Sequence, residues 1–154
     1  MNDSENLYRD TIPSWYQETD EQPKHHRLLI IDDDDDTLSI LKMIFTKVGY
    51  QVDTAKDGQE GLEMLKQKKQ DLVISDIMMP VINGYKFCEL VRSDPDIRLT
   101  PILLITAKKD LFDKVVSLNV GADDFMTKPY NVAELRARVA SLLKMKRLRD
   151  ELIA

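Results

Sequence analysis

A small set of acidic, hydroxyl and basic residues lies where short apolar segments of this chain end. The set comprises Asp32, Asp33, Asp76, Thr106 and Lys128. Three carboxylates held close together repel one another at neutral pH, so they require a cation or a raised pKa. Oxygen ligands suit a hard ion such as Mg²⁺, which keeps several waters and uses only one or two carboxylates. If the segments meet at one place, these residues predict a magnesium site flanked by a lysine and a hydroxyl.

Such a site is suited to phosphoryl transfer. The set contains no activated Ser, Cys or His, whereas an Asp carboxylate can itself be the nucleophile that accepts a phosphoryl group. Neighbouring cations then stabilise the charge on the equatorial oxygens of the transferred group. Each residue alone has a plainer interpretation, since an Asp at a strand end often only caps a turn. Their coincidence at several strand ends favours the chemical interpretation.

The elements that must position these residues alternate regularly along the chain. Short apolar or β-branched runs predict strands at residues 28–31, 51–55, 72–75, 101–105 and 124–127. Apolar residues at helical spacing predict helices that begin near residues 34, 57, 84, 110 and 131. Five strand–helix pairs predict an α/β domain with a parallel sheet. The carboxyl ends of its strands share one edge, where ligands bind in open α/β sheets.

Chain length and composition narrow the class further. At 154 residues the chain suffices for one core and is far shorter than the roughly 250 residues of an eight-fold barrel. We therefore expect a doubly wound sheet. The net charge of −5 argues against a nucleic-acid-binding surface, and the single cysteine, Cys88, is most simply a small core residue. The chain shows neither a membrane-spanning run nor a signal peptide, so we expect a cytoplasmic protein.

The motifs resemble those of the receiver domain of a two-component response regulator. They are Asp32-Asp33 after an apolar strand, Asp76-Ile77-Met78-Met79-Pro80 before Gly84, Ile105-Thr106-Ala107 and Lys128-Pro129-Tyr130. They occur in the family's order and at its spacing over about residues 27–145. The resemblance implies a flavodoxin-like, five-stranded parallel sheet of order 2-1-3-4-5. It also implies a phosphoacceptor signalling domain in a phosphorelay, and not an enzyme with a substrate of its own.

The resemblance assigns the phosphoacceptor and the metal ligands. Asp76 would accept a phosphoryl group from the phosphohistidine of a sensor histidine kinase or a phosphotransfer protein. Mg²⁺, with Mn²⁺ as an alternative, would be held by Asp33, Asp76 and the backbone carbonyl of Met78. Asp32 would act on the ion mainly through bound water.

The remaining motif residues would contact the phosphoryl group or transmit its effect. Lys128 would contact the acyl phosphate, the Thr106 hydroxyl would reorient toward it, and the backbone amide of Ala107 would reach it. Phe125 matches the family's aromatic switch position. The signal would leave through the predicted helix 110–119, the strand 124–127 and the last helix.

Two further side chains are expected to set the lifetime of the phosphorylated state. Met78 lies two residues after Asp76, and Lys108 lies two residues after Thr106. Met78 offers no hydrogen bond to an attacking water, and a protonated Lys108 is a donor that cannot act as a base. We therefore expect slow self-dephosphorylation.

An alternative is a phosphohydrolase of the haloacid-dehalogenase type with Asp33 as its nucleophile. The segment Asp33-Asp34-Asp35-Asp36-Thr37 satisfies that family's Asp-x-Asp-x-Thr pattern, and Thr106, Lys128 and Asp123-Asp124 resemble its other motifs. In this chain, however, the acid pair precedes the lysine, which reverses that family's order. Asp76 would also have no role in such an enzyme.

The last strand and helix resemble those of receivers that form homodimers through this face. Asp124 and Arg138 are candidates to pair across a two-fold axis, although Phe112 stands where that subgroup tends to carry an acid. We expect no binding to membranes and no direct binding to nucleic acid by this domain.

Both ends of the chain differ from the central domain of residues 25–145. Residues 1–24 predict an acidic, flexible arm, in which Tyr8, Ile12, Trp15 and Tyr16 could dock on the domain or on a partner. Residues 146–154 extend the last helix past what a receiver needs. We interpret this extension as a linker to a covalently attached output domain or the start of a coiled coil.

Overall fold

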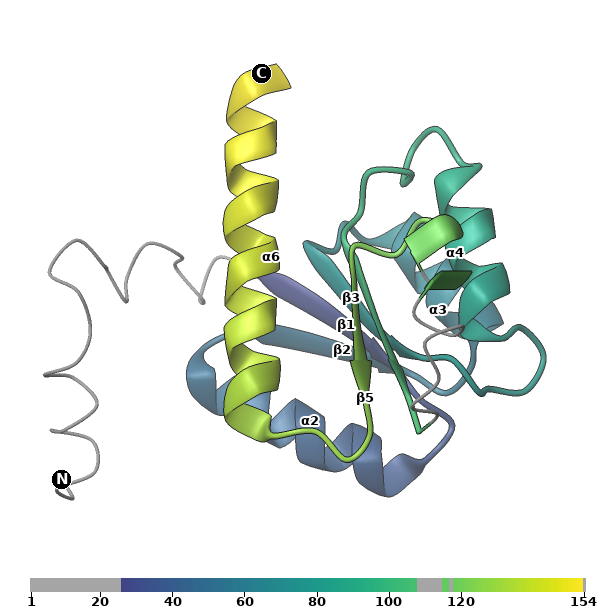
Figure 1. Ribbon diagram of the computed structural model, residues 1–154, viewed down its shortest axis with the longest axis vertical. Coiled ribbons are helices and arrows are strands. Elements are labelled where there is room, and N and C mark those ends of the chain that lie inside the picture. Colours follow the sequence, from purple (N-terminus) through teal and green to yellow (C-terminus); the bar gives the residue numbers. More distant parts are fainter. Residues whose placement is uncertain (1–25, 108–114, 117, 154) are drawn as a thin grey trace, which may run out of the picture.

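The computed structural model describes residues 26–107, 115–116 and 118–153 (Figure 1). The elements in chain order are β1 (Arg27–Ile31), α2 (Asp35–Val48), β2 (Gln51–Ala55), α3 (Gly58–Gln67), β3 (Leu72–Asp76), α4 (Gly84–Arg92), β4 (Ile102–Thr106), β5 (Asp124–Thr127) and α6 (Val132–Ile153). The acidic arm of residues 1–24 lies outside the described residues, as do Lys108, Phe112 and most of the predicted helix 110–119.

The five strands form one parallel sheet in the order β2-β1-β3-β4-β5, which confirms the predicted topology. The register pairs Ile31 with Ser75, Asp76 with Ile105, and Thr106 with Thr127. The residues that end or directly follow β1, β3, β4 and β5 therefore lie side by side. This register brings the predicted site residues to one edge of the sheet.

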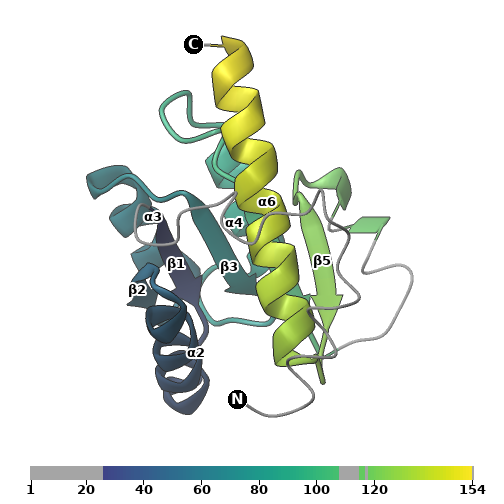
Figure 2. The same ribbon diagram turned by 90° about the vertical axis from the view of Figure 1, so that its left-hand side faces the viewer.

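Helices cover both faces of the sheet, and each face has its own apolar core (Figures 1 and 2). Apolar residues of α2 and α6, such as Phe45 and Leu135, pack on one face. Apolar residues of α3 and α4, such as Leu65 and Phe87, pack on the other. Because the inner strands of a covered parallel sheet are buried on both sides, β1, β3 and β4 consist almost entirely of buried residues.

Local signals in the sequence start and stop the helices. The side chains of Asp57 and Asn83 accept hydrogen bonds from the backbone amides of Glu60 and Lys86, at 2.8 and 2.9 Å. Gly49 ends α2 at a φ of 119°, a left-handed conformation that favours glycine, as predicted. These caps fix where each helix meets the strand before or after it.

Cys88 is fully buried on α4, in the core between the sheet, α3 and α4. Burial raises the pKa of its thiol to about 12, so it remains protonated at neutral pH. The prediction of a small core residue is confirmed. Among the described residues, no helix has the length and apolar character needed to cross a lipid bilayer.

Candidate functional site

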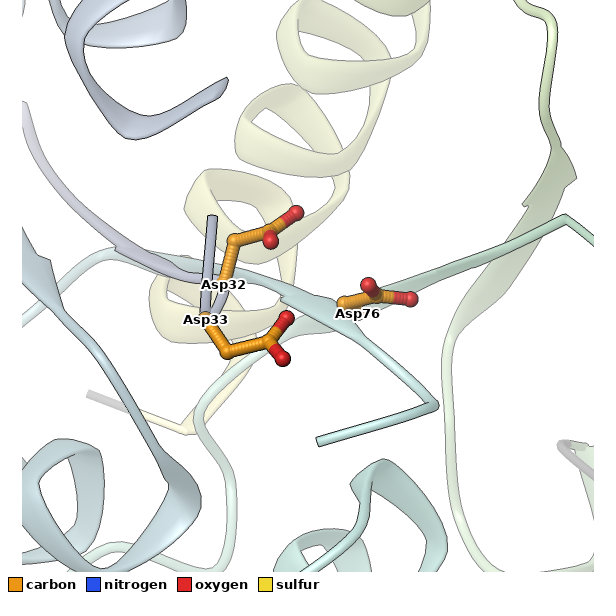
Figure 3. Close-up of side chains that lie close together, drawn as sticks. All are labelled: Asp32, Asp33 and Asp76. Atoms are coloured by element: carbon orange, nitrogen blue, oxygen red, sulfur yellow. The ribbon is translucent and has the colours of Figure 1, made fainter. Parts of the chain in front are cut away.

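Three carboxylates converge at the carboxyl edge of the sheet (Figure 3). One oxygen from each of Asp32, Asp33 and Asp76 lies within 4.8 Å of the other two. Asp32 and Asp33 directly follow β1, and Asp76 is the last residue of β3. Asp32 is buried and Asp33 is exposed, so the cluster opens to solvent on the Asp33 side. The predicted convergence of the strand ends is therefore present in the structure.

Lys128 places one ammonium group beside this cluster. Its Nζ lies 3.5 Å from Oδ2 of Asp32 and 3.5 Å from Oδ2 of Asp76. The backbone amide of Lys128 donates a hydrogen bond of 2.6 Å to the carbonyl of Thr106, which ties the residue to the end of β4. Lys128 therefore contacts both the innermost carboxylate and the one at the end of the central strand.

The electrostatics of the site follow from burial and from these charges. Burial raises the pKa of Asp32, and the hydrogen bond from the amide of Asp34 and the charge of Lys128 offset this rise only in part. Burial acts to lower the pKa of Lys128, but the charges of Asp32 and Asp76 outweigh it and the net shift is upward. The lysine therefore remains a cation at neutral pH.

Thr106, Ala107 and Met78 lie at the same edge, whereas Phe125 is the second residue of β5 and pairs with Leu104 in the middle of β4. Thr106 is completely buried at the end of β4, and Ala107 directly after it is exposed. Phe125 is half-buried and packs against the core on the α3 and α4 side. Met78 is 57% exposed, two residues beyond Asp76.

Comparisons with known proteins agree with this arrangement. The sequence profile of a family described as the response regulator receiver domain matches residues 28–140. The chain belongs to the response regulator receiver domain family. The match covers both acids after β1, Asp76, Thr106 and Lys128.

Named relatives and solved structures are similar to this receiver domain. "Response regulator ArlR" from several Staphylococcus aureus strains is 42% identical over 110 residues, which are 71% of this chain and 49% of the relative. The chain thus spans about half the length of these relatives.

The signal receiver domain of a histidine kinase from Syntrophus aciditrophicus is 38% identical with a TM-score of 0.72, covering 77% of this chain and 89% of that one. The chemotaxis response regulator CheY4 of Vibrio cholerae is 31% identical with a TM-score of 0.72, covering 76% and 98%. None of these matches supports the haloacid-dehalogenase alternative.

The turn after Asp76 is tightly built in this receiver domain. A Cβ atom on Gly84 would lie 2.8 Å from both the carbonyl oxygen of Asp76 and the Cα of Ile77, so only glycine fits at the start of α4. Val81 in the same turn has a φ of 69°, which is strained for a β-branched side chain. No sequence signal predicts a valine in this conformation, and the strain lies within five residues of Asp76.

Arg92 is a structural anchor that the sequence reasoning did not identify. Its Nε donates to the carbonyl of Gly121 at 2.8 Å, and its Nη2 pairs with Asp123 at 2.8 Å. Its Nη1 donates to the carbonyls of Arg98 and Thr100, at 2.8 and 2.6 Å. The guanidinium therefore joins the end of α4 to the loop before β4 and to the residues that lead into β5.

Asp124 and Arg138 pair within one chain of the receiver domain. Nη1 of Arg138 lies 2.9 Å from both carboxylate oxygens of Asp124. Glu134, one turn earlier on α6, accepts a further hydrogen bond from Nη2 of Arg138 at 3.1 Å. The pair expected across a two-fold axis is thus already formed between β5 and α6 of a single chain.

Proposed function

We propose that this receiver domain accepts a phosphoryl group on Asp76 from the phosphohistidine of a sensor histidine kinase or a phosphotransfer protein. The observation that carries the proposal is the position of the Asp76 carboxylate. It ends the central strand, belongs to the three-acid cluster and lies 3.5 Å from the Lys128 ammonium. An anionic nucleophile with a cation beside it is what phosphoryl transfer to a carboxylate requires.

In this transfer an oxygen of Asp76 forms a bond to phosphorus while the bond from phosphorus to the donor's imidazole nitrogen breaks. The Lys128 ammonium then contacts a phosphoryl oxygen, in a charge-assisted hydrogen bond. The hydroxyl of Thr106 turns toward the acyl phosphate, and the amide of Ala107 donates to it. Phe125 on the neighbouring strand responds to the movement of Thr106, and the changed face includes β5 and α6.

The residues present fit a divalent cation. Three carboxylates face a single ammonium group, and their oxygens lie close enough to share one ion. Asp33, Asp76 and the backbone carbonyl of Met78 would hold Mg²⁺ or Mn²⁺, with Asp32 acting through water. When bound, the ion offsets negative charge between the incoming phosphoryl group and the acids.

We further propose that the domain acts in the cytoplasm as a switch within a larger protein, and that it does not turn over a substrate of its own. The chain spans about half the length of its ArlR relatives, which supports an output domain attached through α6.

A homodimer through β5, α6 and the predicted helix 110–119 is compatible with this scheme. In such a homodimer, Arg138 would either retain its ion pair with Asp124 of the same chain or form that ion pair with Asp124 of the second copy.

Metal removal tests the proposal. Acetyl phosphate is expected to phosphorylate the protein in Mg²⁺, and EDTA is expected to abolish the reaction. Asp33→Ala should slow phosphorylation by about tenfold or more, because it removes a ligand and a charge. Asp36→Ala is the matched control, since Asp36 is an exposed acid outside the cluster. Equal phosphorylation with and without the metal, or equal rates for the two variants, would contradict the proposed site.

A further inference from the structure

The C-terminal half of α6 projects past the strands, at the opposite edge of the sheet from Asp76 (Figures 1 and 2). This segment, residues 144–153, combines positive charge with exposed apolar side chains. Its cations are Lys144, Lys146, Arg147 and Arg149, and with Asp150 and Glu151, which pair with three of them, the segment carries a net charge of +2. Its exposed apolar residues are Met145, Leu148, Leu152 and Ile153.

Three of these apolar residues form one stripe. Met145, Leu148 and Leu152 are spaced by three and four residues, which places them on one face of the helix. Their exposed fractions are 63%, 45% and 86%, so the rest of the described chain leaves this stripe largely uncovered. Apolar area exposed in this way gains about 25 cal/mol for each Å² that a partner removes from water.

Grooves lie on both sides of this segment. One, with a volume of about 600 Å³, separates α6 from α3 and the loop before β4, and Lys66 and Lys69 add positive charge to its rim. Within it, the side-chain Oε1 of Gln70 and the Nε of Arg149 are buried without a hydrogen-bond partner among the described residues. The other groove, of about 330 Å³, is lined by His26, Leu143, Lys146, Arg147, Asp150 and Glu151. His26 directly precedes β1, so the chain's first 25 residues enter the domain at this groove.

Those first 25 residues have the complementary composition. They contain six carboxylates against two cations, and thus carry −4 of the chain's net charge of −5. Their apolar residues are gathered at Tyr8, Ile12, Trp15 and Tyr16. Because the segment is covalently attached at the groove, its effective concentration there is on the order of millimolar. A weak contact is therefore sufficient to keep it bound.

We propose that residues 1–25 dock on residues 144–153 of α6 within the same chain. The aromatic side chains around Trp15 cover the stripe of Met145, Leu148 and Leu152, and the acids face the cations beside it. This contact covers the apolar stripe through which α6 would pair with a helix of another chain in a coiled coil. The N-terminal segment then acts as an intramolecular competitor of any assembly through α6. The inference does not depend on the phosphotransfer proposal, because none of these residues belongs to the acidic cluster.

Trp15 is the single tryptophan of the chain, and its fluorescence reports this contact directly. In the 154-residue chain its emission is expected at shorter wavelength than in urea, with acrylamide quenching reduced at least twofold. The double variant Met145→Ser/Leu152→Ser should move both values to those of an exposed tryptophan. Ile40→Ser/Met43→Ser on α2 is the matched control, since both side chains are about half exposed and lie on another helix. Circular dichroism melts verify that each variant is folded.

Three results would overturn the proposal. The first is a solvent-exposed Trp15 in the wild-type protein. The second is a buried Trp15 whose emission does not respond to the α6 variant. The third is a shift that grows with protein concentration between about 1 and 100 μM, because a second copy would then cover the stripe. An emission shift that is independent of concentration, weakened by salt and lost only in the α6 variant supports docking within the chain.

Discussion

At the scale of single residues, the site balances one ammonium group against three carboxylates. The buried Asp32 is the least favourable of these charges, because burial raises its pKa and Lys128 compensates only in part. Such a residue is costly for the folded protein, and the cation binding that we propose for the cluster would explain its presence. Its cost can be measured through the pH dependence of stability.

Asp32→Asn is expected to stabilise the metal-free protein at pH 7. The pKa of Asp32 is higher in the folded protein than the ordinary value of 3.8, so the folded state holds this proton more tightly than the unfolded state. The destabilising effect of ionisation is therefore absent at low pH, grows as the pH rises above 3.8, and is complete above the folded-state pKa. Urea unfolding in EDTA should show the variant's advantage at pH 7 and its loss near pH 3. Asp36→Asn, at an exposed acid, should show no such trend, and a less stable Asp32→Asn protein at pH 7 would contradict the interpretation.

The lifetime of the phosphorylated protein should depend on two side chains that follow Asp76 and Thr106 by two residues in the sequence. Met78 is exposed two residues after Asp76 and gives water no hydrogen bond, and Lys108 supplies no base while protonated. The double variant Met78→Asn/Lys108→Glu should lose its phosphoryl group on the order of tenfold faster, a barrier change of about 1.4 kcal/mol. Decay of the purified phosphoprotein in Mg²⁺ measures this. A wild-type lifetime no longer than the variant's would show that these side chains do not control the reaction.

At the scale of elements, Arg92 connects parts of the chain that the sheet alone does not hold together. Its guanidinium binds three backbone carbonyls and Asp123, from the loop before β4 and the segment before β5. Arg92→Ala is expected to lower the free energy of unfolding by about 2 kcal/mol, because it leaves these acceptors without a charged donor. Arg92→Lys should recover little of this, since an ammonium cannot serve four acceptors in a planar fork.

Urea denaturation measures both Arg92 variants against Arg98→Ala. Arg98 is an exposed arginine in the same region, and its substitution should change stability by less than about 0.5 kcal/mol. If Arg92→Ala is no more destabilising than Arg98→Ala, the anchor has no energetic role.

The elements themselves were largely predictable from the sequence. Each strand boundary was within one residue of the prediction, because buried strands of a parallel sheet are short apolar runs bounded by glycine, proline and acids. The convergence of Asp32, Asp33 and Asp76 followed from one rule, that parallel strands end at a common edge. Gly49 and Asn83 cap helices through local chemistry that the sequence displays.

Long-range side-chain contacts were not predictable in the same way. Arg92 meets Gly121 and Asp123 across about 30 residues, and no periodicity or motif encodes that approach. The pairing of Asp124 with Arg138 was expected between two chains, whereas the position of α6 against β5 brings the two together in one. The strained Val81 depends on how tightly the turn after Asp76 is closed by Gly84, which is a tertiary constraint.

At the scale of the whole molecule, the sheet has different surfaces at its two edges. The carboxyl edge holds the acidic cluster, and the amino edge holds the basic extension of α6 with its grooves. β5 connects the two regions: Lys128 directly follows it, and Asp124 at its start pairs with Arg138 of α6. A displacement of β5 on phosphorylation would therefore reach α6 through an existing ion pair.

The identity of the phosphorylated residue tests the central proposal most directly. The protein is incubated with acetyl phosphate and Mg²⁺, the acyl phosphate is reduced with borohydride, and the modified residue is mapped by peptide mass spectrometry. We expect modification at Asp76 alone, with none in an Asp76→Asn variant, because only this carboxylate ends the central strand beside Lys128. Modification of Asp33 with Asp76 untouched would contradict the proposed phosphoacceptor and would favour the hydrolase chemistry of the alternative.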